Sequence, residues 1–147
     1  MRETVACQVP LVAIAFDHEH VRELEEIGRT LDDHPEFAEW IFEDLVRGRK
    51  NPRTGRRGLS GEQVLRMLIV KQMTGFSYAQ LSFHLGDSTS YRAFCRLGIG
   101  DKPPSTSRLK TNLKRVRAET LEKIHWGVLG DAKERGVEEG RKVRFDC

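Results

Sequence analysis

The chain has 147 residues, of which 38% are hydrophobic and 32% are charged, enough for one moderate core or two small helical units without disulfides or metal ions. Its three cysteines are far apart and form no CxxC pair, which argues against a zinc or redox site. The apolar run 9–16 is shorter than the roughly 20 residues that cross a bilayer, and Glu3 is unlike a signal peptide. We therefore expect a cytoplasmic protein that makes no membrane contact.

Charge is divided unevenly along the chain. Residues 1–46 contain 3 Lys and Arg against 12 Asp and Glu, a balance of −9. Residues 47–117 contain 16 against 3, a balance of +13. A central basic block of this strength is typical of phosphate binding, and the acidic first third either shields it, binds a partner or folds as a unit.

The first third predicts a helical hairpin over residues 1–46. Asp17 is a candidate N-cap and Pro35 suits a first helical turn. Apolar residues recur with helical period in both segments: Val21, Leu24, Ile27 and Leu31, then Phe37, Ile41 and Leu45.

A basic loop is expected over residues 47–59, where six Lys and Arg are mixed with Gly, Pro and Asn and no apolar period appears. Such a loop is either simply solvated or, beside a DNA-binding helix pair, enters a minor groove. Its candidate DNA contacts are Arg53, Arg56 and Arg57.

A helical DNA-binding domain is predicted over residues 60–136. Ser60 and Gln63 form a possible capping box for a long scaffold helix that ends near Gly75, with an apolar face of Val64, Leu65, Leu68, Ile69 and Met73. This helix and the next two should form a compact trihelical unit that buries Leu68, Leu81, Leu85, Tyr91, Phe94 and Cys95.

Residues 77–97 have the pattern of a helix-turn-helix. Ser77 and Gln80 predict one capped helix, Gly86 should end it in a left-handed conformation, and Ser88 should cap a second helix. The second helix would hold Thr89, Arg92 and Arg96 on its outward face, as the major groove requires. Its candidate DNA contacts are Ser88, Thr89, Ser90, Arg92 and Arg96. The same pattern is also compatible with a helix pair that only forms a core.

Two further helices are expected. Ser105 can cap one with an apolar stripe of Leu109, Leu113 and Val116. Its basic residues either lie along DNA or form a plain solvated surface; they are Arg108, Lys110, Lys114, Arg115 and Arg117. The last helix, from about Glu119 to Arg135, should dock on its neighbours or on a second subunit through Leu121, Ile124, Val128 and Leu129, with Trp126 as a packing residue.

Residues 137–147 change period, since Val143 and Phe145 alternate with charged residues as in a strand. A single strand is not stable alone and needs a partner. The expected fold class is therefore all-α with a trihelical helix-turn-helix core, plus one short C-terminal strand.

Several segments resemble the N-terminal domain of bacterial insertion-sequence transposases of the DDE class, in particular the InsH-like kind. The similar segments are Gly75–Leu81, Asp87-Ser88, Phe94–Leu97 and Pro104–Thr106, and the closing stretch Gly140–Asp146 resembles the first strand of the ribonuclease-H-like catalytic domain. The resemblance implies binding to double-stranded DNA at terminal inverted repeats, a role in DNA transposition, and a nucleoid-associated location in a bacterial cytoplasm.

The resemblance also implies a partial catalytic site. Asp146 corresponds to the first of three carboxylates that hold Mg²⁺ in the complete transposase, while the second Asp and the Glu have no counterpart here. We expect a truncated transposase that needs no cofactor for DNA binding and does not cut DNA by itself, which magnesium-dependent cleavage by the 147-residue protein would refute.

Two alternatives stay open from the sequence. The chain could be part of an active transposase completed by frameshifting or a neighbouring frame. It could instead be a dimerising inhibitor that associates with full-length transposase, through its acidic helices or the apolar stripe 121–129.

Overall fold

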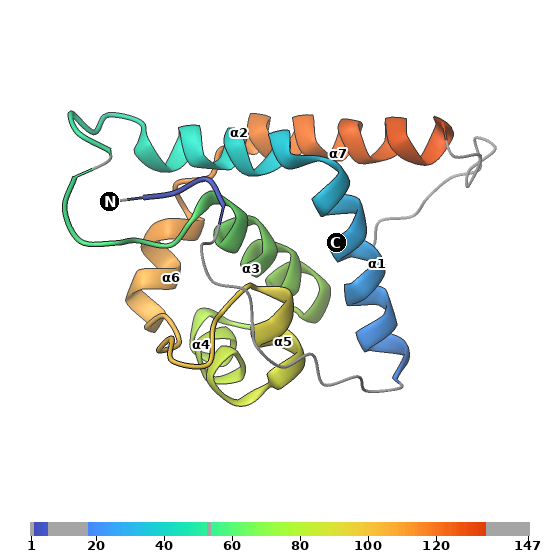
Figure 1. Cartoon of the computed structure of the whole chain (residues 1–147), viewed down its shortest axis with the longest axis horizontal. Helices are drawn as coiled ribbons and strands as arrows, with labels where there is room; N and C mark the ends of the chain where they lie inside the picture. The colour runs from blue at the N-terminus through green and yellow to red at the C-terminus, as the bar shows by residue number, and fades with distance from the viewer. Residues whose placement is uncertain (1, 6–17, 53, 135–147) are drawn as a thin grey trace.

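The computed structural model describes residues 2–5, 18–52 and 54–134, and Figure 1 shows that these form helices and connecting loops without a strand. The helices are α1 (Glu19–Asp33), α2 (Pro35–Val46), α3 (Gly61–Thr74), α4 (Tyr78–Asp87), α5 (Thr89–Phe94), α6 (Thr106–Leu113) and α7 (Ala118–Glu134). The all-α prediction is confirmed for this part of the chain. The predicted strand at 143–146 and the candidate cap Asp17 lie outside the described residues.

Local capping signals set most of the helix starts. The Ser60 and Ser77 hydroxyls accept from the backbone N–H of Gln63 (3.1 Å) and Gln80 (3.2 Å), and both glutamines return a hydrogen bond to the cap backbone. These are the predicted capping boxes. Ser88 and Ser105 cap α5 and α6, and Pro35 opens α2, as expected. The cap of α1 is His18, whose ring accepts from the His20 N–H at 3.1 Å.

Helix α3 is the centre of the fold and contacts α2, α4 and α6. Because neighbours surround it, its buried side is wider than the predicted face: Val64, Met67 and Val70 are completely buried, while Met73 is 39% exposed. The core continues into the other helices through residues such as Ile41, Leu81 and Leu109. Leu68 and Tyr91, predicted as core residues, are only partly buried against it.

Helix α7 lies beside α2 along one edge of the molecule (Figure 1). It buries Ile124 and Thr120, but Leu121 is 41% exposed and Trp126 is 62% exposed. Leu121 and Trp126 therefore do not pack within this chain, because α7 contacts α2 through a narrow stripe; docking of the exposed side chains on a second subunit stays a prediction. None of the described helices is long and apolar enough to cross a membrane.

The turn after α4 differs from the prediction. Helix α4 runs through Gly86 to Asp87, and Ser88 alone connects it to α5. The left-handed glycine is instead Gly75 (φ 71°), in the three-residue link between α3 and α4. Gly86 is used for close packing, since a Cβ there would lie 3.2 Å from Cγ of Pro103. A contact with a residue so far along the chain cannot be inferred from local turn rules.

Candidate nucleic-acid interface

Arg92 does not point outward from α5, which corrects the predicted outward face. Its guanidinium donates to the carbonyl oxygens of Leu85 (3.1 Å), Gly98 (2.6 Å) and Asp101 (2.8 Å). These carbonyls lie at the end of α4 and in the loop before α6. Arg92 therefore ties the α4–α5 pair to the loop that leads into α6.

Arg96 lies beyond the end of α5, which stops at Phe94. Among the described residues it is the one non-glycine with a positive φ, 57°. Its guanidinium donates to both carboxylate oxygens of Asp32 (3.0 and 3.2 Å) and lies 3.4 Å from a Glu62 oxygen. Arg92 and Arg96 therefore do not share an outward face.

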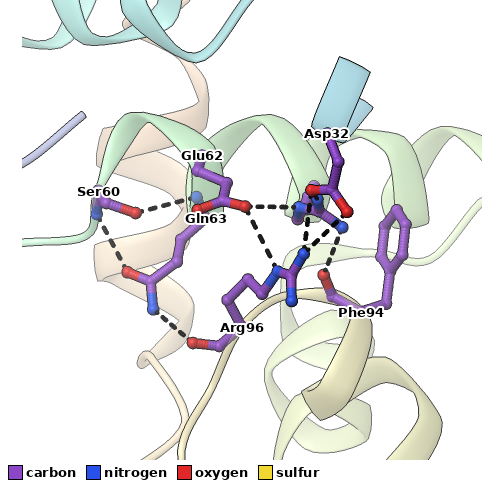
Figure 2. A network of polar contacts seen from close by, with 7 residues as sticks. Asp32, Ser60, Glu62, Gln63, Phe94 and Arg96 are labelled. Carbon is purple, nitrogen blue, oxygen red and sulfur yellow. Dashed lines mark hydrogen bonds and ion pairs between the residues drawn. The ribbon is translucent and has the colours of Figure 1, made fainter. Parts of the chain in front are cut away.

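Figure 2 shows that the Arg96 contacts belong to a polar network between α1, α3 and the end of α5. At its centre is Arg66, which is 2% exposed and contacts Asp32 (2.9 Å), Glu62 (3.3 Å) and the carbonyl oxygen of Phe94 (3.2 Å). Burial lowers the pKa of Arg66, with a further decrease from nearby Arg96. The acidic hairpin thus supplies a counter-ion for the basic centre of the fold.

Helix α5 has little free surface. It packs against α1, and the Tyr91 hydroxyl lies 2.8 Å from Nε2 of His20. Of the predicted contacts near its start, Thr89 is exposed, whereas Ser88 and Ser90 are half-buried. A six-residue helix covered in this way offers a major groove very few side chains.

Helix α6 has a larger exposed polar surface than α5. Leu109, Asn112 and Leu113 are buried on one side. The opposite face, at helical spacing, is exposed and consists of Thr106, Ser107, Lys110, Thr111 and Lys114, the last being the C-cap. Within the described ranges, Lys110 and Lys114 form no ion pair, so this face presents two uncompensated positive charges beside three hydroxyls.

The other basic residues near α6 are turned toward the protein. Arg115 donates to the Leu45 carbonyl oxygen (2.9 Å), and Arg117 binds the Asp44 carboxylate through its backbone N–H (3.0 Å) and Nε (2.8 Å). Both follow the end of α6 at Leu113, so the predicted basic sides of one long helix are corrected to a shorter helix and a connecting turn.

Arg108 borders a basic cleft of about 310 Å³ between the 56–60 loop, α3 and the segment that enters α6. The cleft contains five basic residues and two acidic ones: Arg56, Arg57, Arg96, Lys102 and Arg108, with Glu3 and Asp101. The structure thus brings four sequence-predicted residues together, while Arg53 lies outside the described residues. Lys102 was not predicted because it stands alone in a loop, and the hydroxyl residues of α6 were not predicted because their pattern resembles any solvated surface.

Residues 14–115 match the protein family described as Transposase domain (DUF772). The matched region is more than half of the chain and runs from α1 through α6. The chain belongs to this transposase-domain family. No curated protein and no solved structure gives a match.

The described residues of this transposase domain do not include the carboxylate that the resemblance implies to be catalytic. Asp146, the candidate first carboxylate, lies outside it. Among the described residues, no three His, Cys, Asp or Glu side chains are grouped so that they could hold a metal ion. The three-carboxylate Mg²⁺ site that the resemblance implies is therefore not formed by the described residues.

Proposed function

We propose that this transposase domain binds double-stranded DNA sequence-specifically at the terminal inverted repeats of a mobile element, with α6 in the major groove. The supporting observation is the exposed face of α6, where Lys110 and Lys114 alternate with hydroxyl side chains. Lysine and hydroxyl groups donate to base edges and phosphates. The other side of α6 is anchored in the core by Leu109 and Leu113, so the helix is presented rigidly.

The arrangement around α6 supports a helix-turn-helix with an insertion. Helices α3 and α4 are joined by three residues including the left-handed Gly75, and both helices contact α6. Helix α4 then packs more extensively against α6 than against α5. Its contact with the segment before α6 is fixed by a hydrogen bond from Ser82 Oγ to the Pro104 carbonyl oxygen (2.7 Å). In this proposal α4 supports α6, the helix in the major groove, and α5 is an insertion in the chain between α4 and α6.

The test is binding of the full chain to a duplex enriched by the protein from a random-sequence pool, compared with a scrambled duplex of equal length. Lys110→Ala is expected to weaken binding to the enriched duplex by about 1–3 kcal/mol and to reduce discrimination. Lys133→Ala, at an exposed lysine in the last turn of α7, removes the same charge and is the matched control.

Two outcomes would contradict the proposal. Equal affinity of the unmodified protein for enriched and scrambled duplexes would exclude sequence-specific binding. An equal loss on both duplexes in Lys110→Ala would assign that lysine to phosphate and contradict its proposed part in base recognition.

A further inference from the structure

We propose that the basic cleft beside α6 is a seat for one backbone phosphodiester of the bound DNA. The proposal rests on the proposed DNA-binding function and names a contact that fixes how the DNA lies on α6. The cleft is formed by the 56–60 loop and the 101–108 segment, so it adjoins the first turn of the helix that we place in the groove.

The charges in the cleft are not balanced internally. Its two carboxylates are already engaged: Glu3 accepts from Arg57 at 2.9 Å, and Asp101 accepts from the Gly98 N–H at 2.8 Å. Lys102 is exposed and forms no ion pair with any residue in the described ranges. Among the residues that the structure describes, the Arg108 guanidinium makes one long contact, 3.4 Å to the Arg57 carbonyl oxygen. Lys102 and Arg108 are therefore available to an anion.

A buried arginine next to the cleft wall adds further positive charge. Arg2 is 8% exposed, lies 3.5 Å from the position of a Cβ at Gly58, and donates to Asn112 Oδ1 at 2.6 Å. Burial, together with the neighbouring guanidinium groups of Arg49, Arg115 and Arg108, lowers the pKa of Arg2 to about 10. These like charges repel Arg2, and a bound phosphate would reduce the repulsion.

The cleft geometry favours a phosphodiester of a duplex over an extended ligand. Its volume of about 310 Å³ suits a phosphate with parts of its sugars, and Arg108, which lines it, belongs to α6. Phosphate contacts set the register of a protein on DNA, whereas base contacts specify sequence. A phosphate held by Lys102 and Arg108 would therefore position Thr106 and Lys110 over particular base pairs.

The experiment combines protein and DNA substitutions, using the full chain and the enriched duplex. Methylphosphonate is placed at each phosphate in turn to remove one charge. One position is expected to weaken binding of the unmodified protein by roughly 5–10-fold at 0.1 M salt, the effect of one phosphate contact. Lys102→Ala should cause a similar loss on unmodified DNA and should then be less sensitive than the unmodified protein to methylphosphonate at that position, because only Arg108 still contacts the phosphate. Lys133→Ala should keep the full sensitivity.

The outcomes separate the two proposals. Specific binding without any position coupled to Lys102→Ala or, in a second variant, Arg108→Ala would overturn the phosphate seat and leave the proposed function intact. Absence of DNA binding would overturn both. Inorganic phosphate added at constant ionic strength should not displace DNA; competitive displacement would assign the cleft to a free phosphate ligand and overturn its assignment to DNA. Unfolding curves confirm that each variant is folded.

Discussion

Arg66 shows, at the scale of single residues, how a charged side chain becomes part of the core. Its guanidinium contacts the carboxylates of Asp32 and Glu62 and the carbonyl oxygen of Phe94. Its Cζ atom also lies 5.2 Å from the centroid of the Phe94 ring. A buried charge costs free energy unless such partners are in place. Removing either the charge or its partners therefore disturbs three helices together.

Arg66→Ala is expected to lower the free energy of unfolding by about 2–4 kcal/mol, because it leaves the Phe94 carbonyl and Glu62 with fewer partners in a poorly hydrated region. Urea denaturation followed by circular dichroism measures the change. Arg29→Ala, at an exposed arginine of α1, serves as control and should stay within about 0.5 kcal/mol of the unmodified protein. Similar losses in both variants would contradict a special role for Arg66.

Arg92 is expected to act through stability. Arg92→Ala removes three hydrogen bonds to backbone carbonyls and should cost about 2–3 kcal/mol of unfolding free energy. The ratio of affinities for enriched and scrambled duplexes, measured on the folded fraction, should not change. A reduced ratio would instead support the base contact that the sequence pattern suggested.

Sequence patterns could locate Arg92 and Arg96 but not their partners. Helical spacing placed both on one face, yet α5 ends at Phe94 and the Gly98–Asp101 loop folds back onto Arg92. The Asp32 carboxylate that binds Arg96 is 64 residues away in the chain. Such pairings depend on tertiary structure, which periodicity does not encode.

At the scale of elements, local signals were sufficient where a helix start depends on neighbours in sequence. The serine caps of α3, α4, α5 and α6 all lie where the sequence predicted them. The helix ends were less predictable. The Gly86 prediction failed because Pro103 packs there, and α6 is shorter than its basic pattern suggested.

The cap of α4 gives a direct test of this local control. Ser77→Ala should reduce the free energy of unfolding by about 0.5–2 kcal/mol, because the Gln80 N–H loses its acceptor. Ser77→Asp keeps an acceptor and should restore most of the loss. Ser77 is exposed, so its substitution changes the cap and not the packing, and thermal unfolding of the two variants measures the effect. Equal stability of the alanine variant and the unmodified protein would show that the cap contributes nothing.

At the scale of the whole molecule, the acidic first third and the basic block are joined by specific pairs. Asp32 on α1 binds Arg66 and Arg96, and Asp44 on α2 binds Arg117, just before α7. The charge division was visible in the sequence, but which carboxylates are buried was not. Asp44 is 3% exposed, whereas Glu43 beside it is in solvent.

Asp44 should make the free energy of unfolding depend on pH in the acidic range. Burial alone would raise its pKa, but hydrogen bonds from Thr120 and Arg117 outweigh this and lower it below the ordinary 3.8. Its stabilising contribution is therefore present above pH 3.8 and is lost as the pH falls through the lowered pKa. Asp44→Asn should cost about 1–3 kcal/mol at pH 7, and the difference from the unmodified protein should shrink below pH 4.

Urea unfolding at several pH values measures this difference. Glu43→Gln changes the adjacent exposed carboxylate and should produce no comparable loss at pH 7. A gap between Asp44→Asn and the unmodified protein that is constant down to pH 2 would show that the Asp44 charge does not contribute.

The Asp32 carboxylate, which accepts from both Arg66 and Arg96, makes substitutions in this region interdependent. Removing Asp32 takes a partner from two guanidinium groups at once, so the effect of a second change at Arg96 depends on whether Asp32 is still present. Neighbours in one network are not additive, unlike distant sites. The basic centre of this domain is therefore expected to tolerate variation in α1 only when residues 32, 66 and 96 change in compatible combinations.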